Sequence, residues 1–225
     1  FLLWAALLGA TVSRAQATQT TPPHAPTPPF APASNDASPD FEYAVEAARA
    51  SGRHHLVIFT GLAWETWSRR LDREVLARPE FASSLAADFV LTRVDLPETP
   101  RPDVAPDGPE GRRYALAARF GLHVFPAIYL CTPEGRPYAL VGYVEGGPEV
   151  VRGEIRAKRD AYAAFTARLA TLEGPDLARA LHAWLRALPE PLRALHPEKI
   201  QAVIDADPTD STGLRAHYRL AQTLP

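Results

Sequence analysis

The feature that most constrains the fold of this chain is the apolar run Leu-Val-Ile-Phe at residues 56–59. A strand with one face in water alternates apolar and polar residues, whereas a strand covered by helices on both faces is apolar throughout. Apolar side chains at helical spacing precede this run in residues 41–48 and follow it in residues 64–76. The run therefore predicts a buried strand in an α/β fold, with helices on both sides of the sheet.

The remaining periodicity places further elements along the chain. Asp40 is expected to cap the first helix, and the helix after the buried strand is expected to begin at about Trp64 and to bend at Pro79. Residues 97–111 are rich in proline and acidic side chains, which is typical of a loop. We expect strands at 89–94, 128–131 and 138–144, and helices at 81–87, 112–120 and from 148 to about 172.

Residues 1–17 have the pattern of a secretory signal peptide. They are apolar from Phe1 to Val12 and end in Ala-Gln-Ala, so we expect cleavage after Ala17. No methionine or basic residue precedes the apolar run, and we expect the signal to begin upstream of Phe1. The run is shorter than the about 20 residues that span a bilayer. We therefore predict export to the periplasm or the outside, with no stable membrane span after cleavage; an N-terminal core helix is the alternative.

The rest of the chain divides into three parts. Residues 18–40 are rich in Pro, Thr, Ala and Ser, a composition that is typical of a disordered linker. Residues 41–172 contain the strands and helices of the predicted α/β domain. Residues 173–225 contain amphipathic helical segments separated by prolines, so we expect a helical extension that packs on the domain as a hairpin.

Composition excludes several classes of function. A single cysteine, Cys131, excludes an internal disulfide and a thiolate-rich metal site. The formal net charge is -2 and the arginines are scattered among acids, so we predict no nucleic-acid partner. The pair His54 and His55, and the isolated His123, lack the spacing of metal ligands. We accordingly expect neither a metal nor another cofactor.

Residues 59–75 carry a specific resemblance. They resemble the active-site segment of bacterial exported thioredoxin-like proteins, in which Trp-Cys-x-Trp-Cys precedes a basic helix. Residues 124–127, Val-Phe-Pro-Ala, resemble the cis-proline loop of that family, and residues 142–147 resemble the stretch before its last helix. The resemblance implies a thioredoxin-like three-layer sandwich with a mixed central sheet, followed here by a C-terminal all-helical extension. The motif reads Trp64, Glu65, Thr66, Trp67, Ser68 in this chain.

The departures from the family pattern concern its two cysteines, whose positions hold Glu65 and Ser68. Disulfide exchange needs a thiolate nucleophile and a second thiol, and neither residue supplies one. We expect Glu65 to lie in the first helical turn, where a carboxylate interacts favourably with the helix dipole, and to pair with Arg69. Ser68 has no evident neighbouring base to activate its hydroxyl. The sequence thus predicts a redox-inactive relative and favours a protein that is not an enzyme.

The retained aromatic residues suggest a binding role. Trp64 and Trp67 pack in the core or, if Trp64 is exposed, provide a contact surface for an extended peptide. A cis Pro126 would leave the backbone of Phe125 free to hydrogen-bond a bound strand. We therefore predict a noncatalytic module that binds a peptide or an envelope protein.

Two enzymatic alternatives remain. A thiol-disulfide oxidoreductase or isomerase relative could work through Cys131, as an accessible unpaired thiol, or through the thiols of a partner; the other interpretation of Cys131 is a small buried hydrophobic residue. An acid-base hydrolase would require His123 to approach Glu65 in space.

Overall fold

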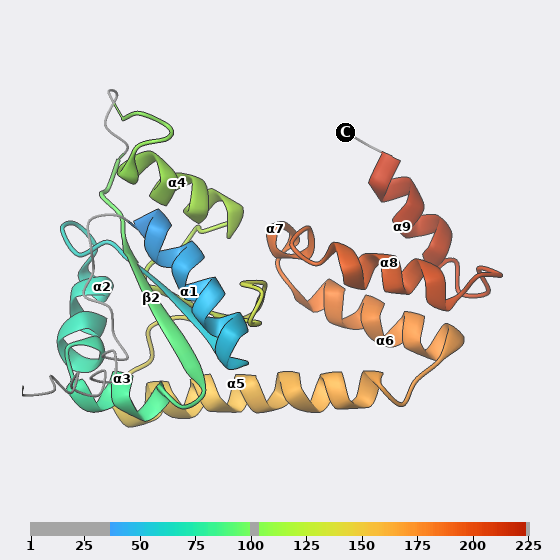
Figure 1. The fold of residues 1–225 in the computed structure, drawn as a ribbon, viewed down its shortest axis with the longest axis horizontal. Helices are drawn as coiled ribbons and strands as arrows, with labels where there is room; N and C mark the ends of the chain where they lie inside the picture. The colour runs from blue at the N-terminus through green and yellow to red at the C-terminus, as the bar shows by residue number, and fades with distance from the viewer. Residues whose placement is uncertain (1–36, 100–103, 224–225) are drawn as a thin grey trace, which may run out of the picture.

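The computed structural model describes residues 37–99 and 104–223 (Figure 1). The expected signal peptide, and the expected linker up to residue 36, lie outside the described residues. The helices are α1 (Ala37–Ser51), α2 (Thr66–Leu71), the π-helical turn η1 (Asp72–Leu76), α3 (Pro79–Leu85), α4 (Pro109–Arg119), α5 (Gly147–Leu169), α6 (Gly174–Ala187), α7 (Glu190–Arg193), α8 (Pro197–Ala206) and α9 (Leu214–Thr223).

The described strands form a mixed sheet in the order β2-β1-β3-β4. Strand β1 (His54–Thr60) pairs in parallel with β2 (Phe89–Asp95), through a crossover that contains α2 and α3. It pairs antiparallel with β3 (Ala127–Cys131), which in turn pairs antiparallel with β4 (Pro137–Val141). The apolar run at 56–59 thus lies in a central strand and is fully buried, as its lack of alternation predicts.

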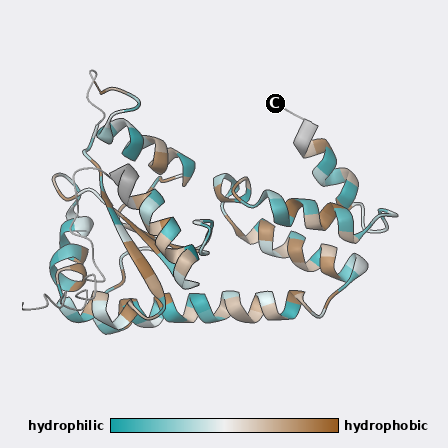
Figure 2. Cartoon of the chain, viewed as in Figure 1, coloured by the Kyte–Doolittle hydropathy of each residue, from teal (hydrophilic) through white to brown (hydrophobic). Residues whose placement is uncertain are grey.

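Helices cover both faces of this sheet, and Figure 2 shows apolar residues concentrated on the strands between them. Leu56 and Ile58 face one apolar cluster, which is completed by α2, η1, α3 and α5. Val57 and Phe59 face the other cluster, which is completed by α1 and α4. The alternation of side chains along β1 therefore divides one apolar run between two cores, and this gives the three layers.

Several helices begin at residues other than those expected. Helix α3 begins at Pro79 and α4 at Pro109, so α4 takes up the end of the expected loop, because proline suits a first helical turn. Helix α1 begins at Ala37, so Asp40 lies inside the helix and is not its cap. Pro39 does not prevent this early start, because the amide groups of a first helical turn have no intrahelical acceptor. Helix α2 begins at Thr66 with Glu65 as its N-cap, two residues after the expected start, and continues into η1 instead of running on as one regular helix.

The C-terminal helices have a core of their own. Leu181 and Leu185 of α6 pack with Val203 and Ile204 of α8, and Tyr218 of α9 joins them. Figure 1 shows α5 running on beyond the sheet toward these helices. No helix in the part of the chain that the structure describes is long and apolar enough to cross a membrane.

The extension contacts the sheet domain through several residues, and its Leu188 and Leu192 belong to the apolar cluster beneath α1 and α4. Trp184 of α6 stacks on Phe165 of α5 at a ring distance of 5.4 Å and meets the ring of His196 edge-on at 4.9 Å. His196 is fully buried and donates from Nε2 to the carbonyl of Pro137 in β4, at 2.9 Å. The extension therefore packs on the sheet domain, as expected, but it does so as a small bundle of helices and not as a single hairpin.

Candidate functional site

The candidate site lies where β1 ends and α2 begins. Asp95, the last residue of β2, accepts hydrogen bonds at the same carboxylate oxygen from the Thr60 hydroxyl and from the backbone amide of Leu62, both at 2.8 Å. These two bonds attach the loop at 61–65 to the neighbouring strand. The start of α2 therefore has a defined position relative to the sheet.

Glu65 is the N-cap of α2. Its backbone is extended, with ψ of 123°, and its carboxylate accepts from the amides of Trp67 at 2.9 Å and Ser68 at 2.5 Å. These amides belong to the first helical turn, whose N–H groups have no acceptor within the helix. The expected favourable interaction with the helix terminus is thus made through direct hydrogen bonds. The expected pair with Arg69 is not formed, because Arg69 donates instead to Thr66 and to the carbonyl of Leu62.

Replacing Glu65 by alanine should destabilise the protein by about 1 kcal/mol, the usual cost of removing a side-chain N-cap. Glu65→Gln keeps an acceptor oxygen but loses the charge, so it should cost less. Urea unfolding of the three proteins, followed by circular dichroism, measures the difference. Equal stabilities of the wild type and Glu65→Ala would show that the cap contributes nothing.

Ser68 occupies the second family cysteine position and faces the protein interior. Its side chain is fully buried, and its Oγ accepts from the backbone amide of Gly61 at 3.0 Å. This bond joins the first turn of α2 to the residue that follows β1. A hydroxyl in this setting is a structural acceptor, and none of its described hydrogen-bond partners is a side-chain base.

Trp64 closes the loop from the outside and is partly buried. Its indole N–H donates to the carbonyl of Leu96 at 2.9 Å, and its ring meets that of Phe125 edge-on at 5.0 Å. The indole packs directly on Gly61. A Cβ at position 61 would lie 2.6 Å from the ring, so the position requires glycine. Trp64 therefore packs the loop against the segment before β3, and only part of its ring is accessible.

The segment before β3 forms the other side of the site. The peptide bond between Phe125 and Pro126 is cis. Val124 is 56% exposed, whereas Pro126 is buried. Within the described chain, neither the amide nor the carbonyl of Phe125 takes part in a hydrogen bond. A backbone donor and a backbone acceptor are thus left at the end of the sheet, next to exposed apolar side chains.

Trp67 is the aromatic residue of the motif that faces solvent. It is 47% exposed, and its ring lies 5.1 Å from that of Tyr143, in the loop between β4 and α5. The guanidinium of Arg70 lies over both rings, at 5.5 Å from Trp67 and 5.2 Å from Tyr143. We call Trp67, Tyr143 and Arg70 the aromatic platform.

Glu74 holds the platform in place. Its carboxylate accepts from Arg70 Nε at 2.9 Å and from the Tyr143 hydroxyl at 2.8 Å. These hydrogen bonds, first that from Arg70 and then that from Tyr143, lower the pKa of Glu74. Glu145 adds a further contact to Arg70 at 3.1 Å. The side chains behind Trp67 are therefore fixed by charge-assisted hydrogen bonds.

Cys131 lies far from this surface in the chain and in the fold. It is the last residue of β3, is fully buried, and belongs to the cluster beneath α1 and α4. Burial raises the pKa of its thiol well above the usual range. The thiolate that disulfide exchange needs is thus disfavoured at this position.

Native Cys131 should react with a thiol reagent at least on the order of a thousandfold more slowly than in urea, because the reagent must wait for an opening of the β-sheet core. Labelling with dithionitrobenzoate in buffer and in urea measures both rates. Labelling in buffer at a rate close to that in urea would contradict the burial of this thiol.

Other chemistry finds little support in the described residues. No hydrogen bond or ion pair there joins His123 to Glu65, as the hydrolase alternative would require. The described part also holds no group of three or more His, Cys, Asp or Glu side chains placed to bind a metal.

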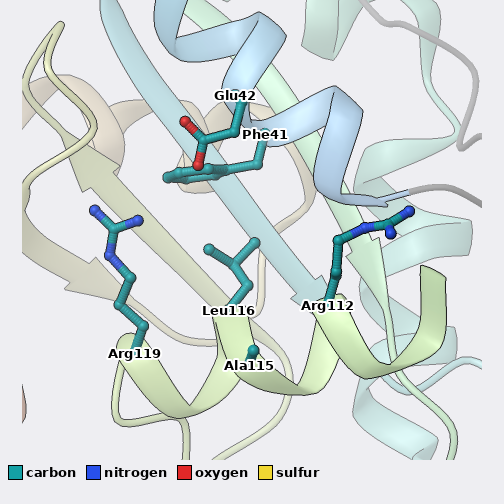
Figure 3. A pocket seen from close by; sticks show the side chains of 6 residues that line it. All are labelled: Phe41, Glu42, Arg112, Ala115, Leu116 and Arg119. Carbon is teal, nitrogen blue, oxygen red and sulfur yellow. The ribbon is translucent and has the colours of Figure 1, made fainter. Parts of the chain in front are cut away.

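A pocket of about 200 Å³ lies between α1 and α4, where Arg112 and Arg119 flank an apolar floor of Phe41 and Leu116 (Figure 3). It is lined by none of the motif residues.

Several residues of the site were not identified from the sequence. Asp95 anchors the loop. Arg70, Glu74 and Tyr143 build the platform around Trp67, and Tyr143 lies far from the other two in the sequence. An acidic residue directly after the predicted strand at 89–94, as at Asp95, was the one available signal. The platform had no such signal, because it joins a helix to a distant loop.

Comparison with known proteins identifies the domain. Residues 41–151 match the model of the family described as thioredoxin-like domain. A solved chain named DsbH Oxidoreductase has a TM-score of 0.46 and 21% sequence identity, over 51% of this chain and 78% of that chain. A search of curated proteins finds no match of significance. The predicted α/β thioredoxin-like fold, followed by further helices, is confirmed by the family match and the mixed sheet.

Proposed function

We propose that the thioredoxin-like domain binds an extended segment of polypeptide at the end of its sheet and exchanges no disulfides. The observation that carries this proposal is the contrast between the two cysteine positions and their surroundings. Glu65 and Ser68 are both structural hydrogen-bond acceptors, whereas Trp67 of the motif and Val124 of the cis-proline segment, whose Phe125 meets Trp64, remain exposed.

The residues present support the proposed lack of dithiol chemistry. A mixed disulfide forms when a thiolate attacks a disulfide, and a second thiol nearby resolves it. Glu65 and Ser68 hold no sulfur, and Cys131 is buried in the core with a raised pKa. The route through Cys131 would require the sheet to open at every turnover.

The case for binding rests on the remaining surface. The amide and carbonyl of Phe125 have no partner among the described residues, and an extended chain can use them as it would use a sheet edge. Trp67 offers a large, rigid apolar surface with few rotatable bonds, the kind of side chain that dominates binding energies at protein interfaces. Trp64 acts behind this surface, as a residue that positions the loop.

We further propose that binding takes place in the cell envelope or outside the cell. The support is the signal-like pattern of residues 1–17, with its apolar run and its Ala-Gln-Ala end. An envelope or secreted protein with an exposed segment is the corresponding partner.

A peptide array tests the binding proposal. Overlapping segments of envelope proteins on a solid support should capture the full chain, and Trp67→Ala should weaken that capture about tenfold or more, as expected for an aromatic hot spot. Tyr43→Ala is the matched control, because Tyr43 is an exposed aromatic residue on α1, outside the site. Capture that is equal for the wild type and Trp67→Ala would reject the proposal.

A further inference from the structure

The N-terminal segment contains a regular repeat of proline. Pro23, Pro26, Pro29 and Pro32 recur at every third residue. A polyproline II helix has three residues per turn, so side chains at this spacing lie along one edge of such a helix. The segment is also uncharged from Thr18 to Asn35, apart from any charge on His24.

The aromatic platform has the chemistry that binds such an edge. Proline-rich segments dock on exposed aromatic rings, because the ligand is already extended and loses little entropy on binding. Trp67 is the most exposed of the three tryptophans in the described chain, and Tyr143 lies beside it. The charge of Arg70 is paired with Glu74 and Glu145, so a neutral ligand meets no unpaired charge among these three residues.

We propose that the platform around Trp67 is occupied by residues 23–32 of the same chain. This inference rests on the proposed function, since it names a resident ligand for the proposed peptide site. Expected cleavage after Ala17 would leave the whole proline repeat on the exported protein.

In a polyproline II conformation the repeat would extend over a surface the size of a small domain. Ten residues of polyproline II span about 31 Å, which is close to the diameter of a small domain. Residues 33–36 join the repeat to α1, which begins at Ala37. The segment would compete with other peptides for Trp67, so binding of a partner would release it.

The test uses full-length protein and two matched pairs of substitutions. Pro26→Ala with Pro29→Ala removes two prolines of the repeat, and Pro22→Ala with Pro28→Ala removes two prolines outside it. The readout is the indole N–H signal of Trp67 in nitrogen-15 NMR spectra, assigned by its loss in Trp67→Phe. The signal of Trp184, in the C-terminal extension, is the internal reference.

We expect the repeat pair to shift the Trp67 signal and the other pair to leave it near its wild-type position. A synthetic peptide of residues 22–33 should move the signal of the repeat variant back toward wild type. It should bind that variant about tenfold more tightly than the wild type, because a tethered segment competes at an effective concentration in the millimolar range. An unchanged Trp67 signal in both variants, with or without the peptide, would overturn the inference.

The remaining outcomes separate this inference from the proposed function. Array binding that depends on Trp67 but has the same affinity in both proline variants would reject the resident segment and leave the proposed function standing. A Trp67 signal that responds to peptide 22–33, with no Trp67-dependent array binding, would reject the wider function and support the inference. A shift of the wild-type signal on dilution would assign the segment to a second copy and overturn binding within one chain.

Discussion

Restoring cysteine at both motif positions is expected to create a disulfide reductase. In an insulin-reduction assay with dithiothreitol, the wild type and Cys131→Ser should not exceed the background, whereas Glu65→Cys combined with Ser68→Cys should accelerate precipitation of the insulin chains. The backbone amides of Trp67 and Ser68, which now bond Glu65, would then face a sulfur at position 65.

The size of this effect follows from thiol ionisation. A helix N-terminus lowers a cysteine pKa from about 8.5 to about 7, which raises the thiolate fraction at pH 7 on the order of tenfold. The second sulfur would stand at position 68, one helical turn away, where it can resolve the mixed disulfide.

Controls for this assay are the single variants Glu65→Cys and Ser68→Cys, which lack a resolving partner and should stay near the background. Circular dichroism checks that each variant is folded. Activity of the wild type would show that the chain performs thiol chemistry through another site. A folded but inert double variant would show that the loop holds the two positions in an unsuitable geometry.

The second large effect is a loss of stability in acid caused by His55. Its ring is fully buried in β1, shares a hydrogen bond of 2.9 Å with the Thr92 hydroxyl, and packs 5.2 Å from Phe41. Within the described residues its Nδ1 has no hydrogen-bond partner. Burial lowers the pKa of His55 from 6.5 to about 4.

The sign of the effect follows from this direction. Because the folded state holds His55 neutral, its contribution is complete above about pH 6.5 and is lost as the pH falls from 6.5 toward 4. A difference of this size between the two states corresponds to about 3 kcal/mol. Burial also lowers the pKa of His54 and His196, and these residues act in the same direction.

Urea unfolding at pH 7.5 and pH 4.5 measures this contribution. The wild type should lose about 2 to 3 kcal/mol more than His55→Gln between the two pH values, since glutamine can still bond Thr92 but does not titrate in this range. Protonation of carboxylate groups lowers the free energy of unfolding of both proteins in acid by the same amount, so this contribution cancels in the comparison. Equal losses in the two proteins would show that His55 is protonated without cost.

Local patterns in the sequence determined much of the fold. The run at 56–59 predicted a strand buried on both faces, because that property belongs to consecutive residues and needs no knowledge of their partners. The resemblance of residues 59–75 and 124–127 then implied the mixed sheet, in which the helical crossover joins a parallel pair and the tight turn joins an antiparallel pair. The single cysteine, likewise, excluded an internal disulfide from the sequence alone.

The tertiary structure decided what the side chains at the site do. Glu65 could pair with Arg69 or cap α2, and the extended backbone at Glu65 selected the cap. Trp64 and Trp67 have similar local context, but Trp64 finds Leu96 and Phe125, whereas Trp67 finds Tyr143 and Arg70 at the surface. His55 is buried because β1 is central in the sheet. Each of these outcomes depends on partners distant in the chain, and periodicity does not encode which distant partner a side chain will meet.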